Sequence, residues 1–176
     1  MCPNGAVYKG QWRNGKHFGQ GRKILPDGSV FSGYWSNGMA NGHGRLLHVN
    51  GDFYLGEWLD DKAHGEGIYV HPDNSFYEGN WFEDNQHGTG TETWADGSKF
   101  EGNWINGEKH GNGKFFWADG SYYDGQFVHN DLEGDGVYFW PDGRMYVGGW
   151  KENKMHKHGT FTWPDNRIYK GEYAND

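Results

Sequence analysis

A 23-residue repeat runs along the chain without insertion or deletion, and no other feature of the sequence limits the fold as strongly. Each repeat carries an aromatic residue, a glycine two residues later and a second aromatic residue after two more. A further glycine stands 13 residues after the opening aromatic in seven complete repeats. The opening aromatics are Tyr8, Phe31, Tyr54, Tyr77, Phe100, Tyr123, Tyr146 and Tyr169. Such a period indicates stacked supersecondary units that bury apolar surface against one another.

The spacing inside each repeat predicts β-hairpins. Residues two apart point to the same face of an extended strand, so aromatic, glycine and aromatic share a face. The segment Pro26-Asp27-Gly28 is typical of a type I turn followed by a left-handed residue. This turn would pair Gly21 with Gly33 and set Trp35 opposite Gly19. Glycine then leaves the large rings room to stack.

The expected fold is an all-β, elongated, single-layer antiparallel meander with two strands per repeat and about fifteen strands in total. Ten Trp, eleven Tyr and eleven Phe supply a core of rings. Residues 1–176 are expected to form one array, with complete repeats starting at 8, 31, 54, 77, 100, 123 and 146 and a partial eighth at 169–176. An array that starts and stops within a repeat suggests a piece of a longer protein, or chains that pair end to end as a homo-oligomer.

The segment YEGNWFEDNQHGTGTETWADGSKFEGNW at 77–104 resembles the membrane occupation and recognition nexus (MORN) repeat, Y-x-G-x-W-x-x-G-x-x-H-G-x-G. The resemblance covers nearly the whole chain. Lys157 replaces the first glycine of the G-x-G element in the last repeat, which puts the geometry of that loop in question. The resemblance implies hairpin arrays that act as accessory scaffolds without chemistry of their own. Such arrays occur in junctophilins, plant phosphatidylinositol phosphate kinases, a lysine methyltransferase, and ciliary and parasite cytoskeletal proteins.

Candidates for catalysis or metal binding are weak. Four histidines share one repeat position, but successive repeats advance about 10 Å, whereas ligands of one zinc ion lie within about 2.1 Å of the metal. We therefore expect loop histidines bonded to the backbone; they are His64, His87, His110 and His156. A strand, not a helix, follows Gly88-Thr89-Gly90, which argues against a phosphate loop. No Ser, Cys or Lys has a general base at readable spacing, so the sequence predicts no enzyme, cofactor or metal.

One repeat position predicts a protein-binding row. A single sheet with an aromatic face has no second layer to cover it, and Trp is enriched at protein interfaces. We expect a protein segment or a helix on this face; the alternative is that the rings only stack within the molecule. The row consists of Trp94, Trp117, Trp140 and Trp163, whereas Leu25, His48 and His71 hold the position in earlier repeats.

The charge pattern bears on two further classes of partner, anionic lipid and nucleic acid. The four repeats from 54 to 145 carry a net charge of -13, from five basic and eighteen acidic residues. This acidic middle disfavours anionic lipid and argues against nucleic acid, which needs a continuous basic track. The first repeat is the exception, with the basic residues Lys9, Arg13, Lys16, Arg22 and Lys23.

The leading interpretation is a non-catalytic scaffold for protein–protein interaction or assembly, cytoskeletal or adjacent to a membrane. One alternative is a peripheral module that binds phosphoinositide or anionic phospholipid through the five basic residues of the first repeat. Another is the regulatory segment of a larger kinase or methyltransferase. A single cysteine, Cys2, and the lack of a signal peptide or an apolar span favour a cytoplasmic location.

Overall fold

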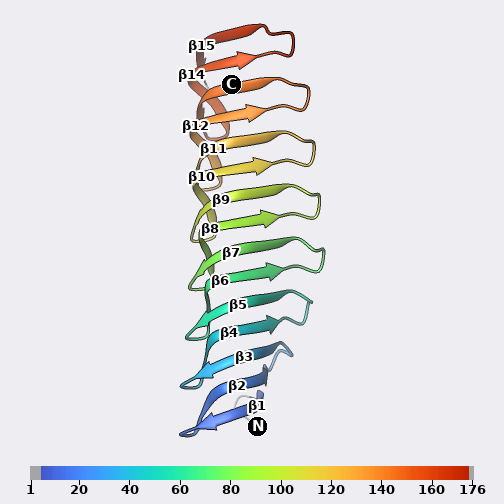
Figure 1. The fold of residues 1–176 in the computed structure, drawn as a ribbon, viewed down its shortest axis with the longest axis vertical. Helices are drawn as coiled ribbons and strands as arrows, with labels where there is room; N and C mark the ends of the chain where they lie inside the picture. The colour runs from blue at the N-terminus through green and yellow to red at the C-terminus, as the bar shows by residue number, and fades with distance from the viewer. Residues whose placement is uncertain (1–4, 175–176) are drawn as a thin grey trace. The chain divides into compact units, whose positions relative to one another are not determined.

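The computed structural model describes residues 5–174, and Cys2 and the end of the partial eighth repeat lie outside this range. Fifteen antiparallel strands follow one another in chain order in one open sheet (Figure 1), which confirms the predicted all-β meander of hairpins. None of the described residues forms a helix long and apolar enough to cross a membrane.

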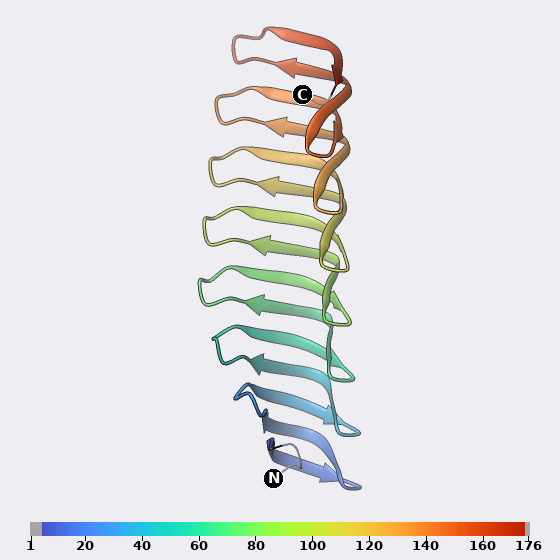
Figure 2. The ribbon, with the colours of Figure 1, turned by 180° about the vertical axis from the view of Figure 1, so that it is seen from behind.

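The chain divides into two compact units at His87 and Gly88. The first contains β1 (Val7–Arg13), β2 (Lys16–Ile24), β3 (Val30–Ser36), β4 (Met39–Leu47), β5 (Phe53–Leu59), β6 (Lys62–Val70), β7 (Phe76–Phe82) and the start of β8 (Asn85–Thr93). The second contains the rest of β8 with β9 (Lys99–Ile105), β10 (Glu108–Phe116), β11 (Tyr122–Val128), β12 (Asp131–Phe139), β13 (Met145–Lys151), β14 (Lys154–Thr162) and β15 (Ile168–Ala174). Within each unit, turns after odd-numbered strands lie along one edge and turns after even-numbered strands along the other (Figure 2).

The turns after even-numbered strands have the predicted geometry. Gly28 adopts φ 91° and donates its N–H to the Leu25 carbonyl at 2.9 Å, while the Leu25 N–H donates to the Ser29 carbonyl at 2.8 Å. The Asp27 carboxylate accepts the Ser29 N–H at 2.9 Å. The resulting register pairs Gly21 with Gly33, as the sequence predicted.

The turns after odd-numbered strands are two-residue turns with positive φ at both positions, which the sequence analysis did not identify. Asp60 and Asp61 have φ 49° and 68°, the pattern of a type I′ hairpin. Asp61 also forms two hydrogen bonds with Ala40 of the preceding repeat. The Asp61 N–H donates to the Ala40 carbonyl at 3.0 Å, and the Asp61 carboxylate accepts the Ala40 N–H at 2.6 Å. The tip residue therefore extends the ladder between repeats, which explains Asp and Asn at this position.

The core of each unit is a chain of aromatic rings in edge-to-face contact. Phe100 lies between Trp104 of its own repeat and Phe127 of the next, with centroid distances of 5.2 and 5.0 Å and planes at 86° and 79°. Phe31 lies in the same way between Trp35 and Trp58, at 5.0 Å from each. Aromatic pairs in this geometry gain about 0.5–1.5 kcal/mol beyond the burial of their surface.

The opening ring lies over a pair of glycines that face each other across the hairpin. A Cβ atom on Gly113 would stand 2.5 Å from the ring of Phe100, and one on Gly102 would stand 2.6 Å from the Cα of Gly113. Glycine thus makes room for a ring, as expected. However, the gap at Gly19, opposite Trp35, is filled by the side chain of Gln11 instead of the Trp ring.

Gly19 has a different role, because it adopts φ 60° at a bulge of the hairpin. The later repeats keep this left-handed residue, and Lys157 adopts it with φ 59°, so the local conformation survives the loss of glycine. The histidine before this position lies in a strand and not in a loop; His64, for example, belongs to β6. The expectation of loop histidines was therefore wrong, because the two-residue tip lets the strand restart earlier.

Lys157 is matched by a second exchange across the hairpin. In other repeats a side chain covers the left-handed glycine, as Gln126 covers Gly134. In the last repeat the covering position is Gly149, and a Cβ there would stand 2.3 Å from the His156 carbonyl oxygen and 3.5 Å from the Lys157 Cβ. Each bulge accordingly accommodates one side chain, from one strand or the other.

Substitution of Gly113 by Ala is expected to destabilise the fold by about 1–3 kcal/mol, since the buried Phe100 ring has no room to yield. Urea unfolding followed by circular dichroism measures the change. Asn112→Ala, at the exposed neighbouring position, is the control and should be nearly neutral. Equal stability of both variants would show that the ring does not need the glycine.

The exchange at the last bulge predicts a favourable coupling of about 1 kcal/mol between Gly149→Gln and Lys157→Gly. Gly149→Gln alone places its Cβ against the His156 carbonyl oxygen and beside the Lys157 side chain, whereas Lys157→Gly in the double variant leaves the backbone of this bulge free to adopt the arrangement of the other repeats. A thermal-unfolding cycle measures the coupling. A control cycle with the exposed Lys154 in place of Lys157 should be additive, and additivity in both cycles would contradict the prediction.

Candidate functional site

Seven rings form a continuous row on one face of the second unit, here called the aromatic ladder. Four are the Trp residues that precede the turns: Trp94, Trp117, Trp140 and Trp163. Between them lie Phe115, Tyr138 and Phe161 of the following repeats. Consecutive centroids along the row are 5.2, 4.6, 5.2, 4.5, 5.3 and 4.5 Å apart. The structure thus brings the four predicted Trp residues together through three rings that the sequence analysis did not select.

Strand register places the ladder on the face of the core rings. Phe115 pairs with both Phe100 and Tyr123, and Trp117 stands two residues further along the same chain direction. The Trp117 N–H donates to the Ser121 carbonyl at 2.9 Å, and the Trp117 carbonyl accepts the Gly120 N–H at 3.0 Å. The tight turn therefore holds each Trp at the edge of the sheet.

The ladder is open to solvent on one side, because all seven rings are only half-buried. Core Trp residues donate their indole N–H internally, as Trp104 does to the Gly90 carbonyl at 3.2 Å. By contrast, no hydrogen bond within residues 5–174 uses the indole N–H of Trp94, Trp117, Trp140 or Trp163. These four indole nitrogens are also not among the buried polar atoms that lack a hydrogen-bond partner. Four donors thus face solvent along the row.

The ammonium group of Lys109 lies against Trp94, the first ring of the ladder. Its Nζ lies 5.0 Å from the ring centroid of Trp94, 5.2 Å from that of Trp104 and 5.5 Å from that of Phe100. The Glu92 carboxylate is 3.9 Å away. Burial lowers the pKa of Lys109, and the charge of Glu92 opposes this effect. Sequence reasoning missed this ammonium group, because no other repeat has a lysine at that position.

Charges beside the ladder differ between its two ends. The Arg144 guanidinium lies 5.3 Å from the Trp140 ring and pairs with Asp142 at 2.8 Å, and an equivalent arginine covers Trp163 at 5.5 Å. The Asp119 carboxylate next to Trp117 accepts the N–H and Oγ–H of Ser121 at 2.8 and 2.6 Å, and these bonds lower its pKa. Within the described residues, no basic side chain forms a salt bridge with Asp119 or Asp96.

The opposite face of the second unit carries a shorter aromatic row, although the sequence analysis expected only one aromatic face. Tyr122 lies 6.2 Å from Phe116 and stacks on Phe139 at 5.3 Å. The Lys114 ammonium lies 5.1 Å from the Tyr122 ring, and the Lys99 ammonium 5.8 Å from the Phe116 ring. Lysine side chains thus cover part of this face.

The first unit replaces the ladder by smaller and more polar groups. His48 and His71 lie 6.4 and 4.9 Å from the ring of Tyr69. Tyr69 donates its hydroxyl hydrogen to Asp52 at 2.8 Å, and burial together with this bond raises the pKa of Tyr69 to about 12. The open row of indoles is therefore a property of the second unit.

The structure does not bring the five basic residues of the first repeat onto one face. Lys9 and Arg22 are opposite each other in the register of β1 and β2, so their side chains share one face of the sheet. Lys23 is on the other face, with its Nζ 5.5 Å from the centroid of the Trp35 ring. Arg13 and Lys16 line a hollow of about 390 Å³ at the hairpin tip. The positive charge of this repeat is consequently spread over both faces and the tip.

The repeated histidines serve as packing groups. His64 and His87 lie 5.3 and 5.6 Å from Phe82, and the Nδ1 atoms of His87 and His156 are buried without a hydrogen-bond partner. Residues 5–174 contain no group of three His, Cys, Asp or Glu side chains placed to hold a metal ion.

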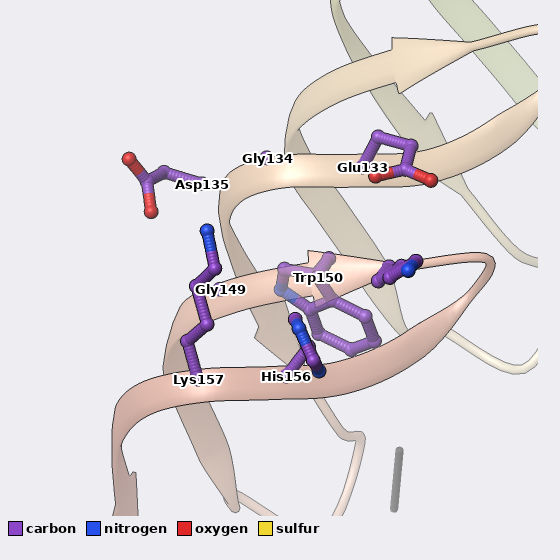
Figure 3. Close-up of a pocket in the computed structure, with 8 residues that line it drawn as sticks. Glu133, Gly134, Asp135, Gly149, Trp150, His156 and Lys157 are labelled. Atoms are coloured by element: carbon purple, nitrogen blue, oxygen red, sulfur yellow. The ribbon is translucent and has the colours of Figure 1, made fainter. Parts of the chain in front are cut away.

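A hollow of about 320 Å³ lies at the tip of the last hairpins. Figure 3 shows Trp150 and His156 at its centre, with Lys157 extended beside Gly149. Its charged lining has both signs, since Glu133 and Asp135 accompany Lys151 and Lys157. This mixture points to no particular ligand.

The repeat pattern and the hairpin geometry correspond to one known family. The MORN repeat model matches seven segments, residues 8–30, 31–53, 54–76, 77–99, 100–122, 123–143 and 146–166. The chain belongs to the MORN repeat family. No curated protein sequence matches it significantly.

Two solved structures are similar in fold to this MORN chain. The SAS-4 (dCPAP) TCP domain of Drosophila melanogaster, in complex with a Proline Rich Motif of Ana2 (dSTIL), has a TM-score of 0.51 and 14% identity, over 88% of this chain and 85% of that one. The G-box domain of the microcephaly protein CPAP has a TM-score of 0.50 and 14% identity, over 97% and 100% of the two chains. Identity this low indicates a shared fold only.

The buried ammonium of Lys109 predicts a pH-dependent stability difference from Lys109→Met, which has the residue that Met155 supplies in the last repeat. Because the pKa of Lys109 is lowered by folding, the unfolded chain holds its proton to higher pH. The stability of the unsubstituted chain relative to the variant should therefore rise as the pH increases from the lowered value toward 10.5.

Urea unfolding of both chains over this range measures the difference. Buried tyrosines, whose pKa values are raised, lower stability at alkaline pH in both chains and cancel. A difference that falls with pH would contradict the burial of a charged Lys109.

Proposed function

We propose that this chain is a non-catalytic scaffold that binds an extended protein segment along the aromatic ladder. One observation carries the proposal: four Trp rings lie half-buried in a row, with indole N–H groups open to solvent. Trp contributes strongly at protein interfaces because it combines a large apolar surface with a hydrogen-bond donor. A partner laid along the row would cover the rings and accept from the donors.

The rigidity of the row supports this role. The Tyr138 ring lies 5.8 Å from the core ring of Trp150, and the Tyr138 hydroxyl donates to the Ser121 Oγ at 3.3 Å. Rings already held in place lose little side-chain entropy on binding, so more of the contact energy appears as affinity.

The similar structures support a protein partner in general terms. One of them is described as a complex with a proline-rich motif of another protein, and the other is described as suggesting a role in centriole elongation. For this chain we carry over only the coarser idea of a protein segment on the sheet, and we propose a cytoskeleton-associated assembly role in the cytoplasm.

Phospholipid binding ranks second. It depends on Lys9, Arg13, Lys16, Arg22 and Lys23, which lie on both faces and at the tip of one hairpin. Recruitment to anionic membranes gains about 1 kcal/mol for each basic residue near the surface, so a divided cluster presents only part of its charge at once.

Selection from a displayed library of random peptides, with the whole chain as bait, tests the proposal. Selected peptides are measured by fluorescence anisotropy against Trp117→His/Trp140→His, which has the residues that the first unit uses at this position. We expect an affinity loss of about tenfold or more, as for central interface aromatics. The control variant, His48→Ala/His71→Ala, should bind within about twofold of the original chain.

Peptides that bind both variants equally, or a library without any binder, would overturn the proposal. Sedimentation with phosphatidylcholine vesicles, with and without phosphatidylserine, tests the second candidate. We expect the chain to stay in the supernatant. Sedimentation that requires phosphatidylserine and disappears when the five basic residues are neutralised would favour the lipid function instead.

A further inference from the structure

The spacing of the ladder restricts the conformation of its ligand. Each Trp reaches the next through one intervening ring, and steps of 5.2 and 4.6 Å keep the Trp94 and Trp117 centroids within about 9.8 Å. Two strand spacings of about 4.8 Å give nearly the same advance, about 9.6 Å for each repeat. A ligand that contacts every Trp in the same way must repeat at this distance.

Among regular backbone conformations, polyproline II fits this spacing best. It advances about 9.3 Å in three residues and returns to the same side after each three. A β-strand returns to the same side every two residues, after about 6.6 Å, and an α-helix returns after seven residues and about 10.5 Å. Over three steps the helix would run out of register by about 3 Å, against about 1 Å for polyproline II.

The free indole groups lead to the same conformation. Polyproline II has no internal hydrogen bonds, so its carbonyl oxygens remain available as acceptors. The four ladder Trp residues hold donors without a partner among the described residues, whereas Trp104 and Trp150 donate to the Gly90 and Gly136 carbonyls. A helical partner would offer no such acceptors, because its carbonyls are bonded internally.

Charge sets a direction for the ligand. Asp96 and Asp119 flank the first half of the ladder without a basic partner in residues 5–174, while Arg144 and Arg167 neutralise the equivalent carboxylates in the second half. Residues 88–176 hold nine Lys and Arg against fourteen Asp and Glu. A basic residue on the ligand is therefore favoured next to Asp96 and Asp119.

We propose that the aromatic ladder binds a proline-rich segment of about ten residues in the polyproline II conformation, with prolines every third residue on the Trp rings. A Lys or Arg of the ligand lies beside Asp96 and Asp119. This inference rests on the proposed function, because it names the occupant of the same row.

Three labelled peptides of equal length test it by fluorescence anisotropy against the whole chain. The first has proline at every third residue and a terminal Arg-Lys pair. The second has the same composition with proline at every fourth residue, and the third is an amphipathic helix former with leucines seven residues apart. We expect the first to bind about tenfold tighter than either of the others.

Two substitutions probe the contacts of the first peptide. Trp140→Phe keeps a ring but removes the donor, and it should weaken binding by about threefold, less than Trp140→His. Asp96→Asn/Asp119→Asn keeps the acceptor for the turn while removing charge, and it should reduce both affinity and salt dependence. Asp73→Asn, in the equivalent turn of the first unit, is the matched control and should change neither.

The outcomes separate this inference from the proposed function. Equal affinity for the three-residue and four-residue spacings, or tighter binding of the helical peptide, overturns the polyproline II ligand. Library peptides that need the ladder would in that case still support the scaffold. Binding of the first peptide that survives Trp117→His/Trp140→His overturns both.

Discussion

The packing of one ring on two facing glycines is the interaction on which this structure depends. Phe100 covers Gly102 and Gly113, and any side chain on either glycine would collide with the ring or the opposing backbone. The close approach lets each opening ring meet the second aromatic of its own repeat and that of the next. A single contact type thus joins residues within a hairpin and between hairpins, so the core needs no second layer.

The backbone at the hairpin tips keeps these rings in register. A two-residue left-handed turn follows the odd-numbered strands from β1 to β13. The second turn residue can bond to the preceding repeat, as Asn153 does when its amide oxygen accepts the Leu132 N–H at 2.8 Å. At the adjoining bulge there is space for one covering side chain. Gln126 over Gly134 and Lys157 over Gly149 are two solutions to the same steric limit, which shows that the limit applies to the pair of strands.

Tryptophan has two distinct roles in this chain. They differ in whether a backbone carbonyl lies within hydrogen-bond distance of the indole N–H. Trp58 in the core donates to the Gly44 carbonyl of the previous repeat at 3.0 Å and is buried. Trp117 stands at a turn where its ring is supported by Phe115 and Tyr138, but its indole N–H finds no acceptor among the described residues. The first kind of Trp stabilises the fold. The second leaves apolar surface and donor capacity for another molecule.

The sequence by itself determined the hairpin array, the even-numbered turns and the pairing of Gly21 with Gly33, because these follow from local spacing and from the φ values that glycine and asparagine tolerate. It also placed the four Trp residues at one repeat position. Only the tertiary structure decided that Phe115, Tyr138 and Phe161 complete the row, that Lys109 lies beneath Trp94, and that Lys9 and Lys23 point to opposite faces. These facts depend on which side chains meet across strands from different repeats. Phe115, Tyr138 and Phe161 recur 23 residues apart, but the period alone does not show which rings they meet, and Lys109 occurs at its position in a single repeat.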